Sequence, residues 1–162
     1  MSIQVFITGG TIAKKYDEIR GTLVFDSEHL HKILSQGRST ADVDIETLML
    51  KDSLDMDEVD REIIYQSCLS TASEKILITH GTDTMVETAT KLAEISGKTI
   101  ILTGAMVPFA FKDSDALFNI GTAFGAFGAS LAHGVYLAMN GQIFLYNDVY
   151  KDKERGEFCS LS

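Results

Sequence analysis

The sequence predicts an α/β fold of the flavodoxin-like, doubly wound type: a mostly parallel sheet with helices on both faces and a C-terminal antiparallel hairpin. Short β-branched runs alternate along the chain with segments of helical periodicity, which is typical of βαβ units. Right-handed crossovers between such units favour an open, doubly wound sheet. In such sheets ligands bind beyond the carboxyl ends of the strands, so the residues that follow each strand are the candidates for chemistry.

The first part of the chain is predicted to form a strand, a helix and a second strand. Residues 3–7 are a short β-rich run, and a helix begins at Ser27 with an apolar face. Gly37 is expected to end that helix. Residues 43–50 alternate between apolar and polar side chains and read as the second strand.

The acidic segment that follows is predicted to be a helix. Asp57 is a typical N-cap residue, and the helix is expected to run to about residue 72. Val59, Ile63 and Leu69 are the apolar residues expected to face the core.

The remaining elements continue the alternation. They are a strand over 75–79, a helix over 84–96 closed by Gly97, a strand over 98–104, a helix over 114–130 and a strand–turn–strand hairpin over 134–148. Asn140-Gly141 is a strong signal for the hairpin turn. The tail from residue 151 is polar. Gly121, Gly125 and Gly128 lie at helical spacing, and they let the helix approach either the sheet or a partner closely.

Composition excludes several classes of partner. The 162 residues are 45% hydrophobic and carry a formal net charge of -9, which argues against binding to nucleic acid or to an anionic membrane. The longest apolar runs are shorter than a bilayer span, and we expect no secretory leader; Cys68 and Cys159 are too isolated in sequence to suggest a disulfide framework. We therefore expect a cytoplasmic protein with two free thiols.

Three predicted strand ends carry hydroxyls or carboxylates. The first ends in Thr8-Gly9-Gly10-Thr11, the second in Asp52-Ser53, and the third in the segment from Thr79 to Thr84. If the first and third strands are neighbours, Thr11 and Thr82 face each other across the crevice. The alternative is that Thr82 or Asp83 only caps the next helix.

The residue types at these ends suit acyl chemistry on a small zwitterion. A threonine hydroxyl needs a base or a nearby cation to act as a nucleophile, and Lys151 lies just past the last strand. Asp83 could hold a substrate ammonium and Ser53 a carboxylate. The four histidines have no partners at metal-ligand spacing, and His80 is best explained by a structural hydrogen bond. We expect neither a metal nor an organic cofactor.

Five motifs together resemble the bacterial-type L-asparaginase family. They are TGGTIA at 8–13, DSLDM at 52–56, ITHGTDTMVETA at 78–89, LTGAMVPF at 102–109 and DALFN at 115–119. They occur in the order of the family, and the resemblance extends from residue 3 to about residue 151. It implies hydrolysis of L-asparagine to L-aspartate and ammonia without a cofactor.

The resemblance also implies roles for individual residues. Thr11 matches the nucleophile of the first motif, and Thr82, Asp83 and Lys151 match the second triad. The matches to the substrate-binding positions are Gly10, Asp52, Ser53, Gly81, Thr82, Asp83 and Ala105. Of these, Ser53 matches the serine that binds the α-carboxylate, Asp83 the binder of the α-amino group, and Ala105 a backbone carbonyl that faces the side-chain amide.

Three expectations concern the surroundings of this site. The polar segment after Thr11 reads as a mobile lid, with Tyr16 as the tyrosine that assists Thr11. Residues 1–162 are expected to form a single N-terminal-type domain without the usual C-terminal domain of the family, and a homodimer or higher homo-oligomer is expected. The alternative functions are a module that binds aspartate or asparagine with weak or no catalysis, and a relaxed ω-amidase that also accepts glutamine.

Overall fold

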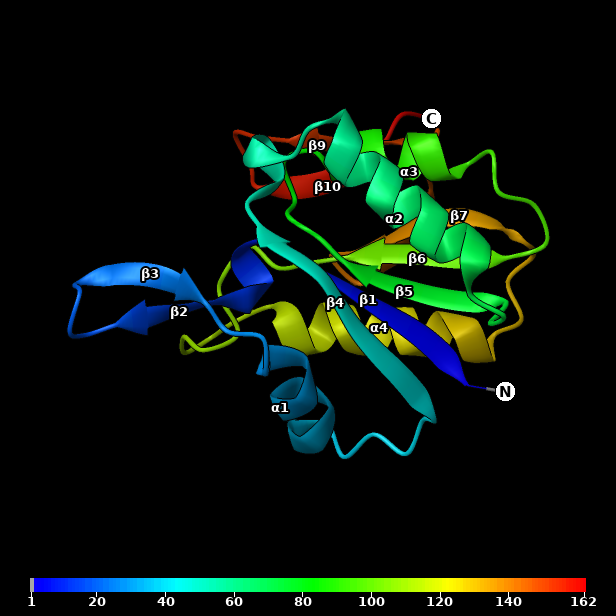
Figure 1. The fold of residues 1–162 in the computed structure, drawn as a ribbon. Helices are drawn as coiled ribbons and strands as arrows, with labels where there is room; N and C mark the ends of the chain where they lie inside the picture. Colours follow the sequence, from blue (N-terminus) through cyan, green and yellow to red (C-terminus); the bar gives the residue numbers. More distant parts are fainter. Residues whose placement is uncertain (1) are drawn as a thin grey trace.

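A central sheet of six strands organises the molecule. The computed structural model describes residues 2–162, and the strand order is β4-β1-β5-β6-β7-β8 (Figure 1). The strands are β1 (Ile3–Gly9), β4 (Val43–Lys51), β5 (Lys75–Thr79), β6 (Thr99–Thr103), β7 (Gly134–Met139) and β8 (Gln142–Leu145). All neighbouring pairs are parallel except β7 and β8. This confirms the predicted flavodoxin-like order, in which the first and third strands of the sequence, β1 and β5, are adjacent.

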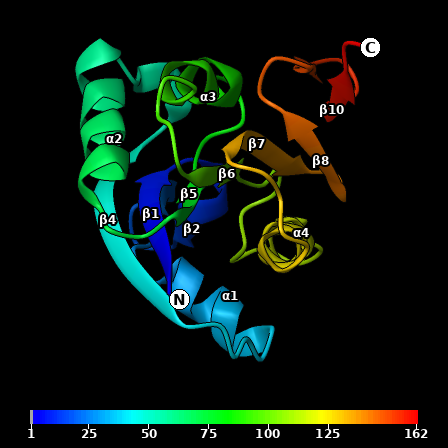
Figure 2. The same ribbon diagram turned by 90° about the vertical axis from the view of Figure 1, so that its right-hand side faces the viewer.

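Helices cover both faces of the sheet, as predicted (Figures 1 and 2). On one face α2 (Glu58–Ser70) and α3 (Met85–Leu92) pack through Ile64, Met85 and Leu92. On the other face α1 (His29–Gln36) and α4 (Ala116–Gly128) pack through residues that include Ile33 and Ile120. Because both faces are covered, the central strands β5 and β6 are nearly continuous buried runs, whereas the edge strand β4 alternates.

The orientation predicted for α2 is wrong. Its N-cap is confirmed, because the Asp57 side chain accepts a hydrogen bond from the Asp60 N–H in a capping box. Val59, Ile63 and Leu69, however, are exposed. The buried side of α2 is formed by Asp60, Arg61, Ile64 and Cys68, so two charged residues occupy inward positions.

Two other helices differ from expectation in detail. Helix α3 ends at Leu92, before Gly97, although Gly97 does adopt a left-handed backbone at φ 74°. In α4 the three spaced glycines are exposed, and a Cβ atom on any of them would find no atom within 4 Å. They therefore do not serve close approach to the sheet.

Two strand pairs lie outside the central sheet. The segment after Thr11 forms a hairpin of β2 (Lys14–Asp17) and β3 (Thr22–Phe25), which projects from the body (Figure 1). The tail is not merely polar, since β9 (Val149–Asp152) and β10 (Glu157–Ser160) form an antiparallel ribbon with Phe158 buried. Short 3₁₀ turns, η1 (Thr11–Ala13) and η2 (Ser53–Asp55), follow β1 and β4.

Within residues 2–162, every helix is too short or too polar to cross a membrane. Cys68 and Cys159 are both free thiols, as predicted. Burial raises the pKa of the Cys68 thiol to about 12, which makes it a poor source of thiolate.

Candidate active site

Glycines bring three strand ends into contact. Gly10 adopts φ 79°, and a Cβ atom there would lie 2.4 Å from the Gly81 nitrogen. A Cβ atom on Gly81 would lie 2.6 Å from Ser53 Oγ. Only glycine allows the backbone to pack this closely. The loops after β1, β5 and β4 therefore meet at one point, which places Thr11, Thr82 and Ser53 on the same edge of the sheet.

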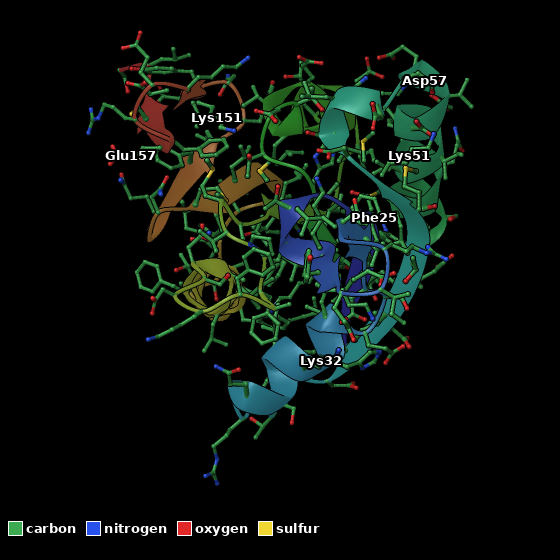
Figure 3. The ribbon with its side chains drawn as sticks, turned by 90° about the vertical axis from the view of Figure 1, so that its left-hand side faces the viewer. Phe25, Lys32, Lys51, Asp57, Lys151 and Glu157 are labelled. Carbon is green, nitrogen blue, oxygen red and sulfur yellow. The ribbon has the colours of Figure 1, made fainter. Side chains whose placement is uncertain are left out.

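Lys151 joins the loop after β5 through two hydrogen bonds. Its Nζ donates to Thr82 Oγ1 at 2.8 Å and to Asp83 Oδ1 at 2.8 Å. The side chain of Lys151 is 11% exposed and Thr82 is 7% exposed, so the contact between these two residues is largely shielded from water, whereas Asp83 is exposed. Figure 3 views this edge of the molecule and shows Lys151 on the C-terminal ribbon. The structure thus brings Lys151 to Thr82 and Asp83, which lie 69 and 68 positions before it in the sequence.

The capping alternative for Thr82 and Asp83 does not describe this loop. The N-cap of α3 is Thr84, and its side chain makes no capping hydrogen bond. The Asp83 carboxylate is paired with Lys151, and the Thr82 hydroxyl lies between Lys151 Nζ and the sulfur of Met106 at 3.7 Å. Both side chains therefore face the site.

Ser53 is buried and held by the start of α3. Its Oγ accepts a hydrogen bond from the Thr84 N–H at 3.3 Å, and its carbonyl accepts one from Thr84 Oγ1 at 2.9 Å. Asp52, directly before it, forms an ion pair with Lys14 at the base of the hairpin. The hairpin that follows β1 is therefore tied to the loop that follows β4.

Ala105 lies beside the same loop. A Cβ atom on the preceding Gly104 would meet the His80 carbonyl oxygen at 2.3 Å and Thr82 Cγ2 at 3.5 Å. Ala105 itself is buried. The end of β6 is thus packed against the end of β5, next to Thr82.

Thr11 and Tyr16 are not brought together. Thr11 is the half-buried first residue of η1, and within residues 2–162 its hydroxyl makes no hydrogen bond. Tyr16 lies in β2 with 56% of its surface exposed. Its hydroxyl lies 3.9 Å from the position of a Cβ atom on Gly21, at the far end of the hairpin. In this conformation of the hairpin, Tyr16 points away from Thr11.

A buried chain of hydrogen bonds lies under the Thr82 loop, and sequence reasoning found only one of its members. His80 is fully buried, with Nδ1 2.7 Å from the Gly81 carbonyl and Nε2 2.8 Å from Thr88 Oγ1. A carbonyl can only accept, so Nδ1 carries the proton and Nε2 accepts from Thr88. Arg61 Nε then donates to Thr88 Oγ1 at 3.3 Å. The expected structural role of His80 is confirmed.

This burial predicts a loss of stability in mild acid. Desolvation lowers the pKa of His80 from 6.5 to about 4. Between those values the unfolded chain binds a proton at His80 that the folded chain does not, so the free energy of unfolding falls as the pH falls from about 6.5 to about 4. The loss is on the order of 3 kcal/mol. Urea unfolding at a series of pH values measures it, and an equal loss in His80→Gln would assign it to other groups.

Within residues 2–162, no group of three His, Cys, Asp or Glu side chains is close enough to hold a metal ion. The polar groups at this edge of the sheet are hydroxyls, carboxylates and the Lys151 amine. A hydroxyl paired with a shielded lysine is an arrangement suited to nucleophilic attack on an acyl group.

Comparison with known proteins shows which family this chain is similar to. The family model described as "Asparaginase, N-terminal" matches residues 2–157. The chain is 34% identical over 164 residues to a probable periplasmic L-asparaginase of Haemophilus influenzae, covering 93% of this chain and 46% of that protein. It is 40% identical over 80 residues to a glutaminase-asparaginase of Pseudomonas fluorescens biotype A, covering 47% of this chain and 22% of that protein.

Among solved structures, the thermostable L-asparaginase from Thermococcus kodakarensis aligns with a TM-score of 0.85 and 29% identity. That alignment covers 99% of this chain and 51% of the other chain. The chain therefore spans about half the length of the relatives that it matches along its whole length.

Proposed function

The chain belongs to the asparaginase family, and from that membership we propose that it hydrolyses L-asparagine to L-aspartate and ammonia. The observation that carries the proposal is the contact of Lys151 Nζ with both Thr82 Oγ1 and Asp83 Oδ1. This contact places the Lys151 amine beside the Thr82 hydroxyl, on the loop that carries the HGTDT motif.

In the proposed reaction a threonine oxygen attacks the carbon of the side-chain amide. Lys151 Nζ, in its neutral form, takes the proton of Thr82, and the Asp83 carboxylate stabilises the ammonium that results. The ammonium then returns the proton to the leaving nitrogen, which departs as ammonia. Water attacks the aspartyl ester through the same relay and restores the hydroxyl. Thr11 is the alternative nucleophile at this edge, and in either case both threonines are required.

The backbone of the same loop supports stabilisation of the oxyanion. His80 Nδ1 donates to the Gly81 carbonyl, which fixes the plane of the Gly81–Thr82 peptide. In a trans peptide the N–H points opposite to the carbonyl. The Thr82 N–H makes no hydrogen bond within residues 2–162, so it is free to donate to a negative charge that develops on the substrate.

The polar groups around this loop fit the two ends of an amino acid. We assign the α-carboxylate of the substrate to Ser53 and its α-amino group to Asp83. The closely packed backbone of Gly10 and Gly81 would lie beneath the bound substrate. Asp52 supports Ser53 from the adjacent position, and the Ala105 carbonyl faces the amide. Neither a metal nor an organic cofactor takes part.

Ammonia release from L-asparagine is the deciding experiment. Steady release, with L-aspartate formed in equal amount, is the expected result. Binding of L-asparagine in a calorimeter without any ammonia would instead identify a binding module. L-Glutamine belongs in the same assay, because part of this chain is similar to a glutaminase-asparaginase. Equal rates on both amides would identify a relaxed ω-amidase.

Replacing Tyr16 by phenylalanine is expected to lower kcat strongly, by about 10²-fold, without unfolding the protein. The hydroxyl is exposed on β2, so its loss costs little stability, whereas closure of the hairpin would bring it to Thr11. Stopped-flow or steady-state ammonia assays measure the effect. Kinetics like those of the wild type would remove Tyr16 from the mechanism.

We also propose that the chain forms a homo-oligomer and acts in the cytoplasm. The exposed glycines of α4 and the exposed Phe118 leave room for a second copy to pack on that helix. Sedimentation of the active protein as a monomer of 17.7 kDa would contradict the assembly. The compartment rests on the sequence, since the name of the Haemophilus relative points to the periplasm.

A further inference from the structure

Lys151 does not belong to the central sheet. It lies on β9, which pairs only with β10, and this ribbon forms a sheet of its own. Phe158 is the residue opposite Lys151 in the ribbon. The position of the lysine amine at Thr82 therefore depends on how the ribbon is fixed to the rest of the molecule.

Asn140 fixes the strand opposite Lys151. Its Oδ1 accepts the backbone N–H of Phe158 at 2.8 Å. That N–H points away from β9, because it is bonded to Asn140 and not to the Lys151 carbonyl. The side chain of Phe158 is buried in the core, which also fixes β10.

Asn140 is in turn connected to the site by a second asparagine. Its N–H donates to Asn119 Oδ1 at 3.2 Å. Asn119 is 1% exposed, and its Nδ2 donates to the Gly104 carbonyl at 3.0 Å and to Asp115 Oδ2 at 3.1 Å. Hydrogen bonds through Asn119 and Asn140 thus connect the loop beside Thr82 to β10, the strand that pairs with the Lys151 strand β9.

The turn alone does not require an asparagine side chain. Asn140 and Gly141 adopt φ values of 54° and 73°, as a two-residue type I′ turn needs. Glycine serves the first position of such a turn as well as asparagine does. The contact with Phe158 is therefore a separate property of this residue.

We infer that Asn140 is a positioning residue for the reaction: it docks the β9–β10 ribbon so that Lys151 Nζ reaches Thr82 and Asp83. The inference rests on the proposed function for its effect on turnover. The effect of Asn140 on the position of Lys151 is independent of that function. It can be measured even if the protein has no activity.

The test compares three variants. Asn140→Gly keeps the turn and loses the acceptor, and kcat for L-asparagine is expected to fall by about 10- to 100-fold, since a small misplacement of a reacting group has effects of this size. Asn140→Asp keeps an acceptor oxygen and tolerates the left-handed backbone, so it is expected to restore kcat. Asn147→Gly makes the same chemical change in an exposed turn and is expected to behave as the wild type.

A second measurement separates this inference from the proposed function. Competitive acetylation, mapped by mass spectrometry, compares Lys151 with the exposed Lys153 in each variant. Lys151 is expected to react several-fold faster in Asn140→Gly than in the wild type, at an unchanged melting temperature. Unchanged labelling would overturn the inference, whether or not the wild type releases ammonia. Absence of ammonia from the wild type would overturn the proposed function alone.

Loss of folding is also a decisive outcome. Asn140→Ser, whose shorter side chain does not span to Phe158, is the second variant without the acceptor. If both Asn140→Gly and Asn140→Ser fail to fold, Asn140 is a folding residue and the inference is wrong.

Discussion

Replacing Thr82 by valine is expected to lower kcat for L-asparagine by at least about 10³-fold at an unchanged melting temperature. Valine keeps the shape of a buried side chain and removes the hydroxyl that Lys151 contacts, so the loss falls on the chemistry and not on packing. Nucleophile or proton-relay groups contribute effects of this order. Ammonia release under saturating substrate measures it.

Two companion variants sharpen this result. Thr82→Ser keeps a hydroxyl and is expected to retain activity within about 10-fold of the wild type, because the proton transfer it supports is still possible. Lys151→Met is expected to match the loss in Thr82→Val, and the double variant is expected to lose no more, because groups that act as a unit are not additive. A Thr82→Val enzyme with most of its activity would remove Thr82 from the reaction.

Replacing Thr11 by valine is expected to have an effect of the same size, again about 10³-fold in kcat. Thr11 follows Gly10, which packs against Gly81, and its hydroxyl makes no hydrogen bond within residues 2–162. Its loss therefore breaks no hydrogen bond within residues 2–162, and Thr11→Ser is the matched control.

The two valine variants together can show which threonine is acylated. Intact-mass spectrometry of samples quenched during turnover is expected to detect an aspartyl ester in the variant that keeps the nucleophile. Full activity in Thr11→Val would show that Thr11 is neither the nucleophile nor a residue that assists it.

The sequence predicted the central sheet well, because strands and helices have local signals. Strands such as 75–79 are apolar runs bounded by polar residues, and the parallel order follows from their alternation with helices. Thr82 and Ser53 could be named as candidate site residues because each follows a strand, at the edge where a doubly wound sheet binds ligands.

The orientation of α2 could not be found in this way. Periodicity counts apolar residues, and Val59 and Ile63 are spaced as on one helical face. The buried position instead goes to Arg61, whose guanidinium contacts Thr88, Glu58 and Glu87. A charge that is paired through three partners from two helices leaves no signal in a hydrophobic pattern.

The ribbon and its attachment were missed for a related reason. Only Val149 and Phe158 are buried in it, too few for a recognisable strand pattern. Asn140 did carry a signal, but the turn accounted for it fully. Its second partner lies 18 residues further along the chain, and only the three-dimensional structure reveals such a contact.

The separation of the ribbon from the central sheet also divides the protein into parts of unequal stability. Strands β1, β5 and β6 each pair with a neighbouring strand on both sides. Their amides are therefore expected to exchange with deuterium only when the whole domain opens. Those of β9 and β10 have one partner strand and can exchange through a local opening. Activity would then disappear, on heating or in mild denaturant, before the fold does, because Lys151 leaves with the ribbon while the sheet remains intact.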